Sequence, residues 1–292
     1  MAHLNILILG VNRYPRACIS AFESFLELFD IVSINVYAGF IVPPDACISN
    51  PLSGEMNIRL EDPYGSLWAP YLCCPSFIYE QTEFQGSQYY SCYQAAIQSS
   101  LSRMDIFSDN YKSIHNYHHY LFSAFLFALD LRQIIQPGLT LLLRPDVIYS
   151  SDEPSAFKQY LSSPVDSSVI TLGYDRYGQV NDKFFFSSWP LIKLILQRLI
   201  CVPRFLLPPW RYFHSETFVR WYLQNQRMKV AYASPALRAR RIRSNGQFVD
   251  SDSCVYEGCK NSSIFSKNYF REQALYQLWL SLGQRSTQQS IN

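Results

Sequence analysis

The sequence lacks the motifs that usually identify nucleotide-binding and hydrolytic enzymes. It contains no GxGxxG or GxxxxGK[ST] loop, so neither a dinucleotide fingerprint nor a P-loop is indicated. It also contains no GxSxG element, paired Cys/His motif or protein-kinase motif set, which leaves hydrolase and kinase interpretations without a basis. The eight cysteines include no CxxC pair and their spacing fits no zinc module. We therefore expect buried, reduced thiols in a cytoplasmic protein.

Charge and long apolar runs are scarce as well. Only 16% of the 292 residues are charged and the net charge is +2, so a basic face for nucleic acid is not indicated. No run reaches the roughly 18 uninterrupted apolar residues that a membrane span needs. The nearest candidate is residues 189–210, an apolar segment interrupted by Lys193, Arg198 and Arg204. Such a segment either lies on an anionic membrane surface or packs as a helix on the core, with its basic side in water.

Apolar and aromatic residues are abundant instead. They make up 48% and 16% of the chain, which excludes disorder for most of its length. Stretches with strand and helix character alternate, and this alternation predicts an α/β fold with a parallel sheet. Strands are expected at 5–9, 31–40, 141–152, 167–175 and 228–234. Helices are expected at 18–29, 89–107, 116–135, 215–227 and 266–283, the fourth capped by Ser215.

We expect one α/β domain over residues 1–283, followed by a polar tail at 284–292. Residues 43–90 are rich in Pro, Asn, Gly, Ser and Tyr and show no sustained period. They are expected to form an irregular, loop-rich insertion, and a region of this kind is often functional.

The stretch LLLRPDVIYSSD (141–152) reads as a buried strand that carries Arg144 and Asp146. Ligands of open α/β sheets bind beyond the carboxyl ends of the strands, which gives charged residues there a functional reason. Carboxylate oxygens suit Mg²⁺ or Mn²⁺. Alternatively, both side chains pair with other charges where the strand ends. The loop after the first strand carries Gly10 and Arg13, which could hold a nucleotide or a phosphate.

Further candidates lie later in the chain. Asp182 and Glu216 are possible general bases, although an Asn-Asp pair is usually a turn and a Glu in a first helical turn stabilises the helix dipole. A run of arginines at 238–243 has two possible roles, because it either clamps a diphosphate or forms a solvated basic edge. Its members are Arg238, Arg240, Arg241 and Arg243. His115, His118 and His119 share one helix face, for which helix packing is favoured over a metal pair.

The order of these motifs resembles one group of enzymes. LGVNRYPR (9–16) follows the first strand, and a long buried helix runs into LLLRPDVIYSSD (141–152). VNDKFFFSS (180–188) comes next, and HSETFVRWYLQNQR (214–227) leads into RARRIRSNG (238–246). In this order the chain resembles surface-polysaccharide glycosyltransferases, including lipopolysaccharide-synthesis proteins of the WavE type and related viral and bacterial sequences. The resemblance covers most of residues 5–245 and does not extend to 43–90.

The resemblance implies a nucleotide-sugar-dependent glycosyltransferase with a GT-A-like fold. Gly10, Arg13 and Arg144 would lie on the nucleotide side, and Arg241 and Arg243 would bind the diphosphate. Asp146 would occupy the position of a DxD-type ligand that holds Mn²⁺ or Mg²⁺ on the diphosphate. Arg144 stands where the first acid of that pattern is expected, so an arginine could neutralise a phosphate in place of the metal.

The resemblance also assigns roles to the two later acids. Asp182 would lie in the sugar or acceptor pocket, and Glu216 would be the catalytic base if the enzyme inverts configuration. A retaining reaction would need no such base, and the sequence leaves both outcomes open.

The expected partners are a nucleotide-sugar donor and a glycan or lipid-linked acceptor in surface-polysaccharide synthesis, without nucleic acid. The expected location is the cytoplasm or the inner face of a membrane, with peripheral contact through residues 189–210. Two alternatives stay open. One is a fucosyltransferase-like GT-B enzyme, which predicts two similar α/β halves and a nucleotide site near the arginine run. The other is a non-catalytic scaffold of polysaccharide assembly at a membrane surface.

Overall fold

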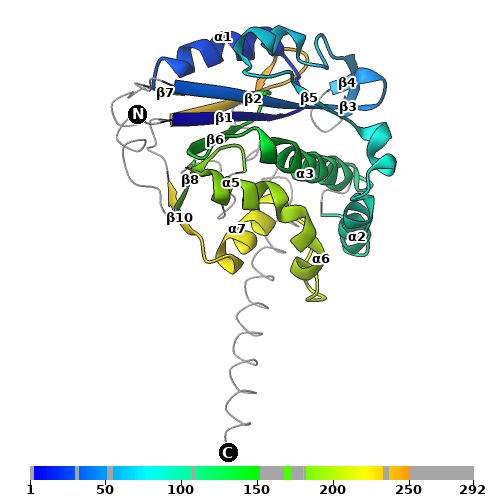
Figure 1. Cartoon of the computed structure of the whole chain (residues 1–292). Helices are drawn as coiled ribbons and strands as arrows, with labels where there is room; N and C mark the ends of the chain where they lie inside the picture. Colours follow the sequence, from blue (N-terminus) through cyan, green and yellow to red (C-terminus); the bar gives the residue numbers. More distant parts are fainter. Residues whose placement is uncertain are drawn as a thin grey trace, which may run out of the picture.

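A seven-stranded sheet lies at the centre of the computed structural model, with the strand order β10-β8-β9-β6-β1-β2-β5 (Figure 1). The structure describes residues 3–29, 33–50, 55–106, 109–151, 168–172, 180, 182–232 and 237–249. All neighbouring strands are parallel except where β9 pairs with β6 and β8. The expected α/β fold, with a mainly parallel sheet flanked by helices, is confirmed.

The strands of the central sheet are β1 (His3–Gly10), β2 (Ser33–Val42), β5 (Phe77–Glu80), β6 (Leu139–Leu143), β8 (Ser168–Thr171), β9 (Phe185–Ser188) and β10 (Lys229–Tyr232). Two smaller sheets consist of β7 (Val147–Ser151) with β11 (Leu237–Ile242) and β12 (Phe248–Val249), and of the hairpin β3 (Cys47–Asn50) with β4 (Glu55–Arg59). β1 and β6 are almost fully buried, as strands of a sheet covered on both faces are.

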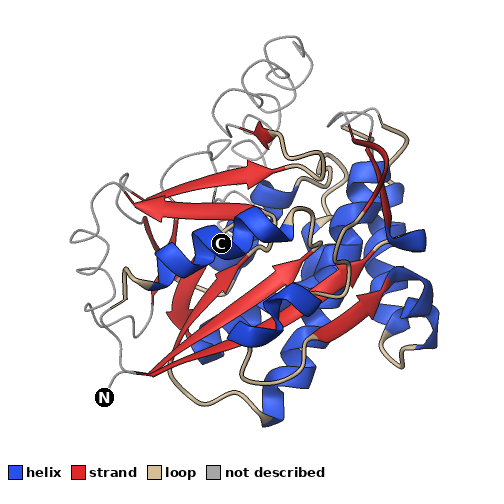
Figure 2. Ribbon diagram, turned by 90° about the horizontal axis from the view of Figure 1, so that it is seen from above, coloured by secondary structure: helices blue, strands red, loops and turns tan. Residues whose placement is uncertain are grey.

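Helices cover the two faces of the central sheet unequally (Figures 1 and 2). α1 (Pro15–Leu26) lies on one face, together with β7. The opposite face carries α2 (Tyr90–Leu101), α3 (Lys112–Asp130), α5 (Trp189–Leu196), α6 (Val202–Phe205) and α7 (Ser215–Asn225). Short 3-10 helices connect these elements: η1 (Pro44–Ala46), η3 (Ser66–Tyr71), η4 (Gln81–Gly86), η5 (Leu131–Gln133) and η6 (Gln197–Cys201).

The core divides into two layers because side chains of a strand alternate between the faces of its sheet. In β1, Ile6 and Ile8 belong to the layer under α1, whereas Leu7 and Leu9 belong to the layer under α3. Aromatic residues fill much of both layers. Phe122, Phe127, Phe185 and Phe218 lie in the α3 layer, and Phe22, Phe25, Phe184 and Phe186 lie in the α1 layer.

The stretch 141–152 is not the single strand that the sequence predicts. β6 ends at Leu143 in the central sheet, and β7 begins at Val147 and pairs with β11 in a different sheet. Pro145 explains the break, because proline has no N–H for the sheet ladder and restricts the residue before it. Arg144, Pro145 and Asp146 therefore form a turn at the carboxyl end of β6.

Other expectations also change in detail. The cap of α7 is His214, whose ring nitrogen accepts a hydrogen bond from the Thr217 N–H, so the prediction of Ser215 as cap was wrong. Residues 43–90 contain the β3–β4 hairpin and β5, which extends the central sheet at its edge. The helix expected at 266–283 and the tail at 284–292 lie outside the described residues. Within the described chain, no helix has both the length and the apolar character needed to cross a bilayer.

Candidate functional site

The candidate site lies where β1 and β6 end side by side. β1 leads through α1 to β2 on one side, whereas β6 lies on its other side and is reached from α3 on the opposite face. Neighbouring strands whose connections diverge in this way leave a crevice at their carboxyl ends, and ligands of α/β proteins bind in such crevices. Gly10 ends β1 there, and its φ of +147° favours glycine. A Cβ at Gly10 would lie 3.0 Å from Cδ of Pro145, so the two strand ends are in close contact.

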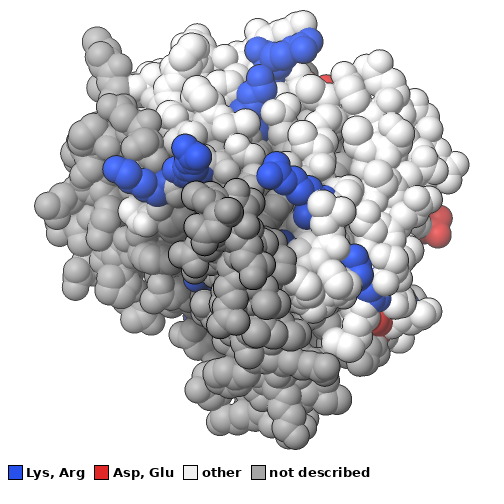
Figure 3. Space-filling view, turned by 90° about the horizontal axis from the view of Figure 1, so that it is seen from below, with Lys and Arg blue, Asp and Glu red and all other residues white. Residues whose placement is uncertain are grey.

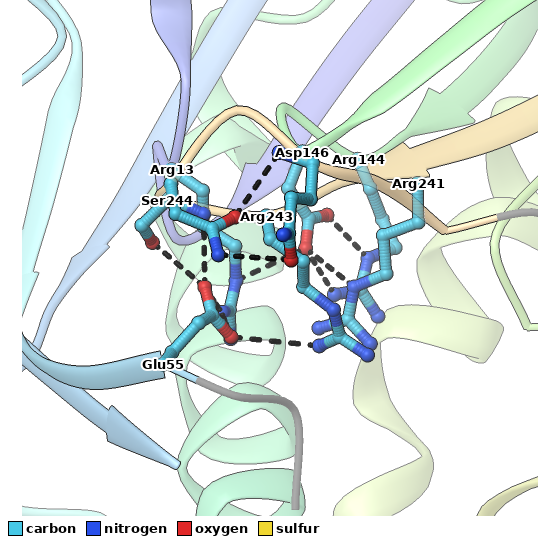
Figure 4. Close-up of polar contacts among 9 residues, drawn as sticks. Arg13, Glu55, Arg144, Asp146, Arg241, Arg243 and Ser244 are labelled. Carbon is cyan, nitrogen blue, oxygen red and sulfur yellow. Dashed lines mark hydrogen bonds and ion pairs between the residues drawn. The ribbon is translucent and has the colours of Figure 1, made fainter. Parts of the chain in front are cut away.

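Three arginines bind Asp146 in the turn after β6 (Figure 4). Arg144 donates from Nε and a terminal nitrogen to the two carboxylate oxygens, at 2.9 and 3.0 Å. Arg241 on β11 donates from Nε to Oδ2 at 3.0 Å, and Nε of Arg13 lies 3.3 Å from the same oxygen. The Asp146 side chain is only 1% exposed. Its charge therefore interacts almost entirely with these guanidinium groups.

Glu55 is a second buried acid in the same cluster (Figure 4). It begins β4, its side chain is fully buried, and Arg13 donates to its two oxygens at 2.6 and 2.5 Å. The N–H and the hydroxyl of Ser244 donate to Oε1 at 2.9 and 2.8 Å, and a terminal nitrogen of Arg243 lies 3.5 Å from Oε2. Arg13 thus connects the two acids. We call Arg13, Arg144, Arg241 and Arg243, with Asp146 and Glu55, the arginine cluster.

The arginine cluster carries four positive and two negative charges, which leaves two positive charges uncompensated among its members. Burial favours the neutral form of Asp146, but Arg144, Arg241 and Arg13 outweigh it and hold its pKa well below the ordinary range. The pKa of Arg241 is lowered to about 9, mainly by burial and in part by the neighbouring guanidinium groups, against the opposing charge of Asp146. The guanidinium groups therefore repel one another, and an anionic ligand would relieve that repulsion.

The residues around Asp146 do not fit a divalent cation. Both carboxylate oxygens already accept hydrogen bonds from guanidinium groups, and a cation there would face three positive charges at close range. Among the described residues, no group of three or more His, Cys, Asp or Glu side chains is arranged to hold a metal ion. The Asp146 carboxylate, as the guanidinium groups surround it here, therefore does not fit the Mn²⁺ or Mg²⁺ expected at this position.

Arg144 connects the arginine cluster to a layer of buried tyrosines. Its guanidinium carbon lies 5.9 Å from the ring centre of Tyr120 on α3. The backbone N–H of Arg144 donates to the Tyr149 hydroxyl at 3.1 Å, and that hydroxyl donates to the Lys183 carbonyl at 2.6 Å. The guanidinium carbon of Arg198 lies 5.7 Å from the centre of the same Tyr120 ring, and Arg198 donates to the Tyr117 hydroxyl at 3.2 Å. The contacts with Tyr120 and Tyr149 hold Arg144 in position.

The charge of Asp182 acts on the arginine cluster and on the amino end of α7. Burial lowers the pKa of Arg144, but the carboxylates of Asp146 and Asp182 raise it above its ordinary value. Burial lowers the pKa of His214, the cap of α7, to about 4, and Asp182 opposes that shift. Glu216 lies in the first turn of α7 and is 7% exposed. The negative charge of Asp182 thus affects both Arg144 in the arginine cluster and His214, the cap of the helix that carries Glu216.

A cleft of about 700 Å³ opens beside the arginine cluster, at the carboxyl ends of β2 and β5. Its walls include Asp45, Glu80, Arg59 and Tyr64, and the Tyr64 side chain is 50% exposed. Asp62 also lines the cleft, and Asn12 donates to its backbone carbonyl at 2.6 Å. Asn12 directly precedes Arg13, so this hydrogen bond connects a wall of the cleft to the segment that carries one member of the arginine cluster. Its volume is within the usual range of small-molecule sites, about 300–1,000 Å³.

The structure brings together most of the residues that the sequence analysis selected for nucleotide binding. Arg13 and Arg144 contact Asp146, and Gly10 lies against the adjacent Pro145. Arg241 on β11 and Arg243 directly after that strand join the cluster from almost 100 positions further along the chain. Sequence reasoning missed Glu55 and Ser244. Glu55 belongs to the irregular region 43–90, where no motif marked it, and Ser244 acts partly through its backbone N–H.

The remaining expectations concern histidines and cysteines. His118 is buried, with Nε2 3.0 Å from Ser100 Oγ and Nδ1 2.8 Å from the Ile114 carbonyl, so the helix-packing interpretation is confirmed for it. The six described cysteines are all free thiols. Only Cys18 among them is fully buried, and Cys73 is exposed, so the expectation of buried thiols was wrong for Cys73.

No protein-family model and no curated protein sequence matches this chain. Among solved structures, it is similar to mouse xyloside xylosyltransferase 1 in its apo form, with a TM-score of 0.39 and 9% identity over 79% of this chain and 84% of that one. It is also similar to the inositol-1-phosphate CTP transferase of T. maritima, with a TM-score of 0.37 and 12% identity over 88% of this chain and 94% of that one. Likeness at this level assigns no function, so the proposal below depends on the site alone.

Proposed function

We propose that the chain is a glycosyltransferase that moves a sugar from a nucleotide-sugar donor to a glycan or lipid-linked acceptor in surface-polysaccharide synthesis. The arginine cluster is the observation that carries this proposal. It places four guanidinium groups at the carboxyl ends of β1 and β6 and leaves two positive charges uncompensated. A diphosphate group has the charge and the paired oxygens that such guanidinium groups bind.

The adjoining cleft supports a nucleotide rather than a simple phosphate as the ligand. A nucleoside in the cleft would place its base near the exposed ring of Tyr64 and its ribose hydroxyls near the carboxylates of Asp45 and Glu80. Along β4, Arg59 in the cleft and Glu55 in the arginine cluster are four residues apart, about 13 Å at the rise of a strand. In this proposal the nucleoside and the diphosphate occupy neighbouring sites toward opposite ends of this strand.

The chemistry requires stabilisation of the leaving group and removal of a proton. An acceptor hydroxyl oxygen forms a bond to the anomeric carbon of the sugar while the bond from that carbon to the diphosphate oxygen breaks. The negative charge that develops on the diphosphate would be stabilised by the arginine cluster, whose guanidinium groups are held by Asp146, Glu55 and Tyr120 before any ligand arrives.

The proton of the acceptor hydroxyl needs a base if the reaction inverts configuration. Asp182 is the first candidate, because its charge acts on both Arg144 and His214. Glu216 is the second candidate, in the helix that His214 caps. A retaining reaction would use neither as a base. We assign no step to a metal ion, because the oxygens of Asp146 are already bound by arginines.

The proposal includes a cytoplasmic location, which the six free thiols among the described cysteines support because thiols persist in a reducing compartment. The GT-B alternative predicts two similar α/β halves. The described residues instead form one large central sheet with two small sheets beside it, which favours the single-sheet alternative. The scaffold alternative predicts no nucleotide binding, so a nucleotide-binding experiment distinguishes it from both enzyme alternatives.

Thermal unfolding with a panel of nucleoside diphosphates and nucleotide sugars, with Mn²⁺ or with a chelator, tests the proposal. We expect UDP or GDP to raise the melting temperature, and we expect the shift to persist in the chelator. Arg241→Gln should reduce the nucleotide shift, because Asp146 keeps Arg144 and Arg13 as partners while one guanidinium is removed. Incubation with the stabilising nucleotide sugar and a glycan extract then tests sugar transfer.

Arg132→Gln is the matched control, because Arg132 is exposed in η5, which precedes the amino end of β6, whereas the arginine cluster lies at its carboxyl end. It should bind nucleotide as the wild type does. No response of the wild type to any nucleotide would reject both enzyme interpretations and leave the scaffold. A shift that vanishes in the chelator would restore a metal to the site and overturn the arginine-only assignment.

A further inference from the structure

The segment from α5 to the loop after α6 has an unusual distribution of charge. Residues 189–213 include Lys193, Arg198, Arg204 and Arg211 and contain neither Asp nor Glu. They form α5, η6 and α6 in direct succession, in the helical layer on the side of the sheet opposite α1 (Figure 1). The inner side of this helical run is part of the core. Ile192, Ile195, Leu196, Leu199, Val202 and Phe205 are all essentially inaccessible to solvent.

The outer side of the run is apolar as well. Leu194, Ile200 and Leu207 are 39%, 56% and 73% exposed. Leu194 lies on α5, Ile200 on η6, and Leu207 just after α6, so exposed apolar side chains recur along this whole succession of helices. A helical segment that is apolar on its outer side as well as its inner side is suited to contact a second apolar surface besides the protein core. We call these three residues the outer stripe.

The end of α2 extends the outer stripe. Leu101 and Met104 are 36% and 52% exposed, and α2 packs on both η6 and α6. Arg103, between them, donates to the carbonyls of Leu206 and Pro209 and so holds this end of α2 against the chain beside Leu207. The exposed apolar side chains of two separate segments therefore lie on neighbouring parts of one face.

Cationic groups accompany the stripe. Lys193 and Arg204 belong to the same helical run, and Arg204 is exposed. Figure 3 shows this side of the molecule with several groups of Lys and Arg among uncharged residues, and with Asp and Glu visible only near the margin. A face that combines exposed aliphatic residues with cations and few acids is complementary to an anionic lipid surface.

We propose that this face, centred on Leu194, Ile200 and Leu207, docks the protein onto the surface of an anionic bilayer. The aliphatic side chains enter the boundary between headgroups and acyl chains, while Lys193 and Arg204 lie at the headgroup phosphates. No described helix could cross the bilayer, so the contact is peripheral. A second copy of the chain is a poorer occupant, because a symmetric contact would bring the same cations together. This inference is independent of the proposed activity.

Flotation of the purified protein with vesicles tests the docking face. One set contains phosphatidylcholine alone and the other contains phosphatidylcholine with phosphatidylglycerol. We expect binding to the anionic vesicles that weakens as salt is raised. Ile200→Asp with Leu207→Asp should abolish it, and Lys193→Glu with Arg204→Glu should lower the apparent affinity by about tenfold or more, since each basic residue near an anionic surface contributes about fivefold.

Ile134→Asp is the matched control, because Ile134 is an exposed aliphatic residue outside this face, at 43%. It should bind vesicles as the wild type does, and circular dichroism and melting temperature should show that all variants fold. Equal binding of the double variants and the wild type would overturn the proposal, as would failure of the wild type to bind anionic vesicles. A wild-type dimer in sedimentation that Leu207→Asp dissociates would also overturn it and assign the face to self-association.

Discussion

Arg144 binds both carboxylate oxygens of Asp146, the residue two positions after it, at 2.9 and 3.0 Å. Pro145 between them breaks the strand and turns the two side chains toward each other at the end of β6. The same carboxylate accepts a hydrogen bond from Arg241, which lies 95 positions further along the chain. A local turn thus becomes the point at which β11 is fixed to the central sheet, and Asp146 has both a structural and an electrostatic role.

Asp146→Asn is expected to destabilise the protein by about 3–5 kcal/mol, because removal of one partner leaves buried like charges uncompensated. Arg144, Arg241 and Arg13 would then face one another without the carboxylate that separates them. Urea unfolding at neutral pH measures the change. Asp45→Asn is the control, since Asp45 is exposed and asparagine tolerates its positive φ. Equal stability of the two variants would show that the buried charge contributes nothing.

Gly10→Ala is expected to lower stability by about 1–3 kcal/mol, because alanine at a φ of +147° is strained and its Cβ would press on Pro145. The strain falls at the turn that positions Arg144, so ligand affinity should fall together with stability. Gly86→Ala is the matched control, because a Cβ there meets nothing within 4 Å. Thermal unfolding of both variants, with and without nucleotide, gives the comparison. An unchanged Gly10→Ala protein would contradict the close contact of β1 with the turn.

Acid should destabilise the fold between pH 6.5 and pH 4 through buried histidines. Burial lowers the pKa of His118, His119 and His214 from 6.5 to about 4. The unfolded chain therefore takes up protons first as pH falls, so stability is complete above about pH 6.5 and decreases toward pH 4. For His118 alone the difference corresponds to about 3 kcal/mol. Asp146 does not contribute to the loss of stability between pH 6.5 and pH 4. Its pKa is lowered in the folded protein, so the stability that its charge provides is lost only when the pH falls below the ordinary carboxylate range.

Melting temperatures of the wild type and His118→Gln at pH 7.5 and pH 5 measure the effect. The variant should be less stable at pH 7.5, because it loses the contacts to Ser100 and Ile114. It should also lose less stability than the wild type when the pH is lowered. An identical pH dependence in both proteins would show that His118 does not titrate in this window.

The strands and helices that the sequence predicts well are those with strong local patterns. Residues 6–9 are uniformly apolar and lie within β1, and the apolar spacing in 116–135 corresponds to most of α3. The break within 141–152 was equally present in the sequence, as Pro145, but the run of leucines before it and Val147 after it favoured one strand. Which sheet each half joins depends on pairing with β11, and that pairing is not encoded in the local pattern.

The candidate site was predictable only in part. Arg144 and Asp146 could be found because charges at the end of an apolar strand are unusual. The other partners of Asp146 are Arg13, in the loop after β1, and Arg241 on β11. Glu55, which binds Arg13, stands in a segment without periodicity, so contact among these residues depends on the folded arrangement. The same limit applies to the metal. A single aspartate after a strand is compatible with a cation or with arginines, and only the three guanidinium groups around Asp146 distinguish the two.

The cleft and the arginine cluster should bind different parts of one ligand, and this separates them experimentally. Tyr64→Ala removes an exposed aromatic wall of the cleft without touching any charge. We expect it to weaken binding of the stabilising nucleotide by about 1–3 kcal/mol, the usual contribution of one base stacked on an aromatic side chain. Binding of inorganic pyrophosphate should be unchanged, because that ligand would contact only the guanidinium groups.

Arg243→Gln supplies the complementary change. It removes a guanidinium from the cluster, while Glu55 keeps Arg13 and Ser244 as partners. We therefore expect it to weaken binding of pyrophosphate and nucleotide by similar factors. Isothermal titration of both ligands with wild type, Tyr64→Ala and Arg243→Gln gives the full comparison. If Tyr64→Ala weakens pyrophosphate and nucleotide equally, the cleft does not hold the nucleoside, and the base must lie elsewhere along the carboxyl edge of the sheet.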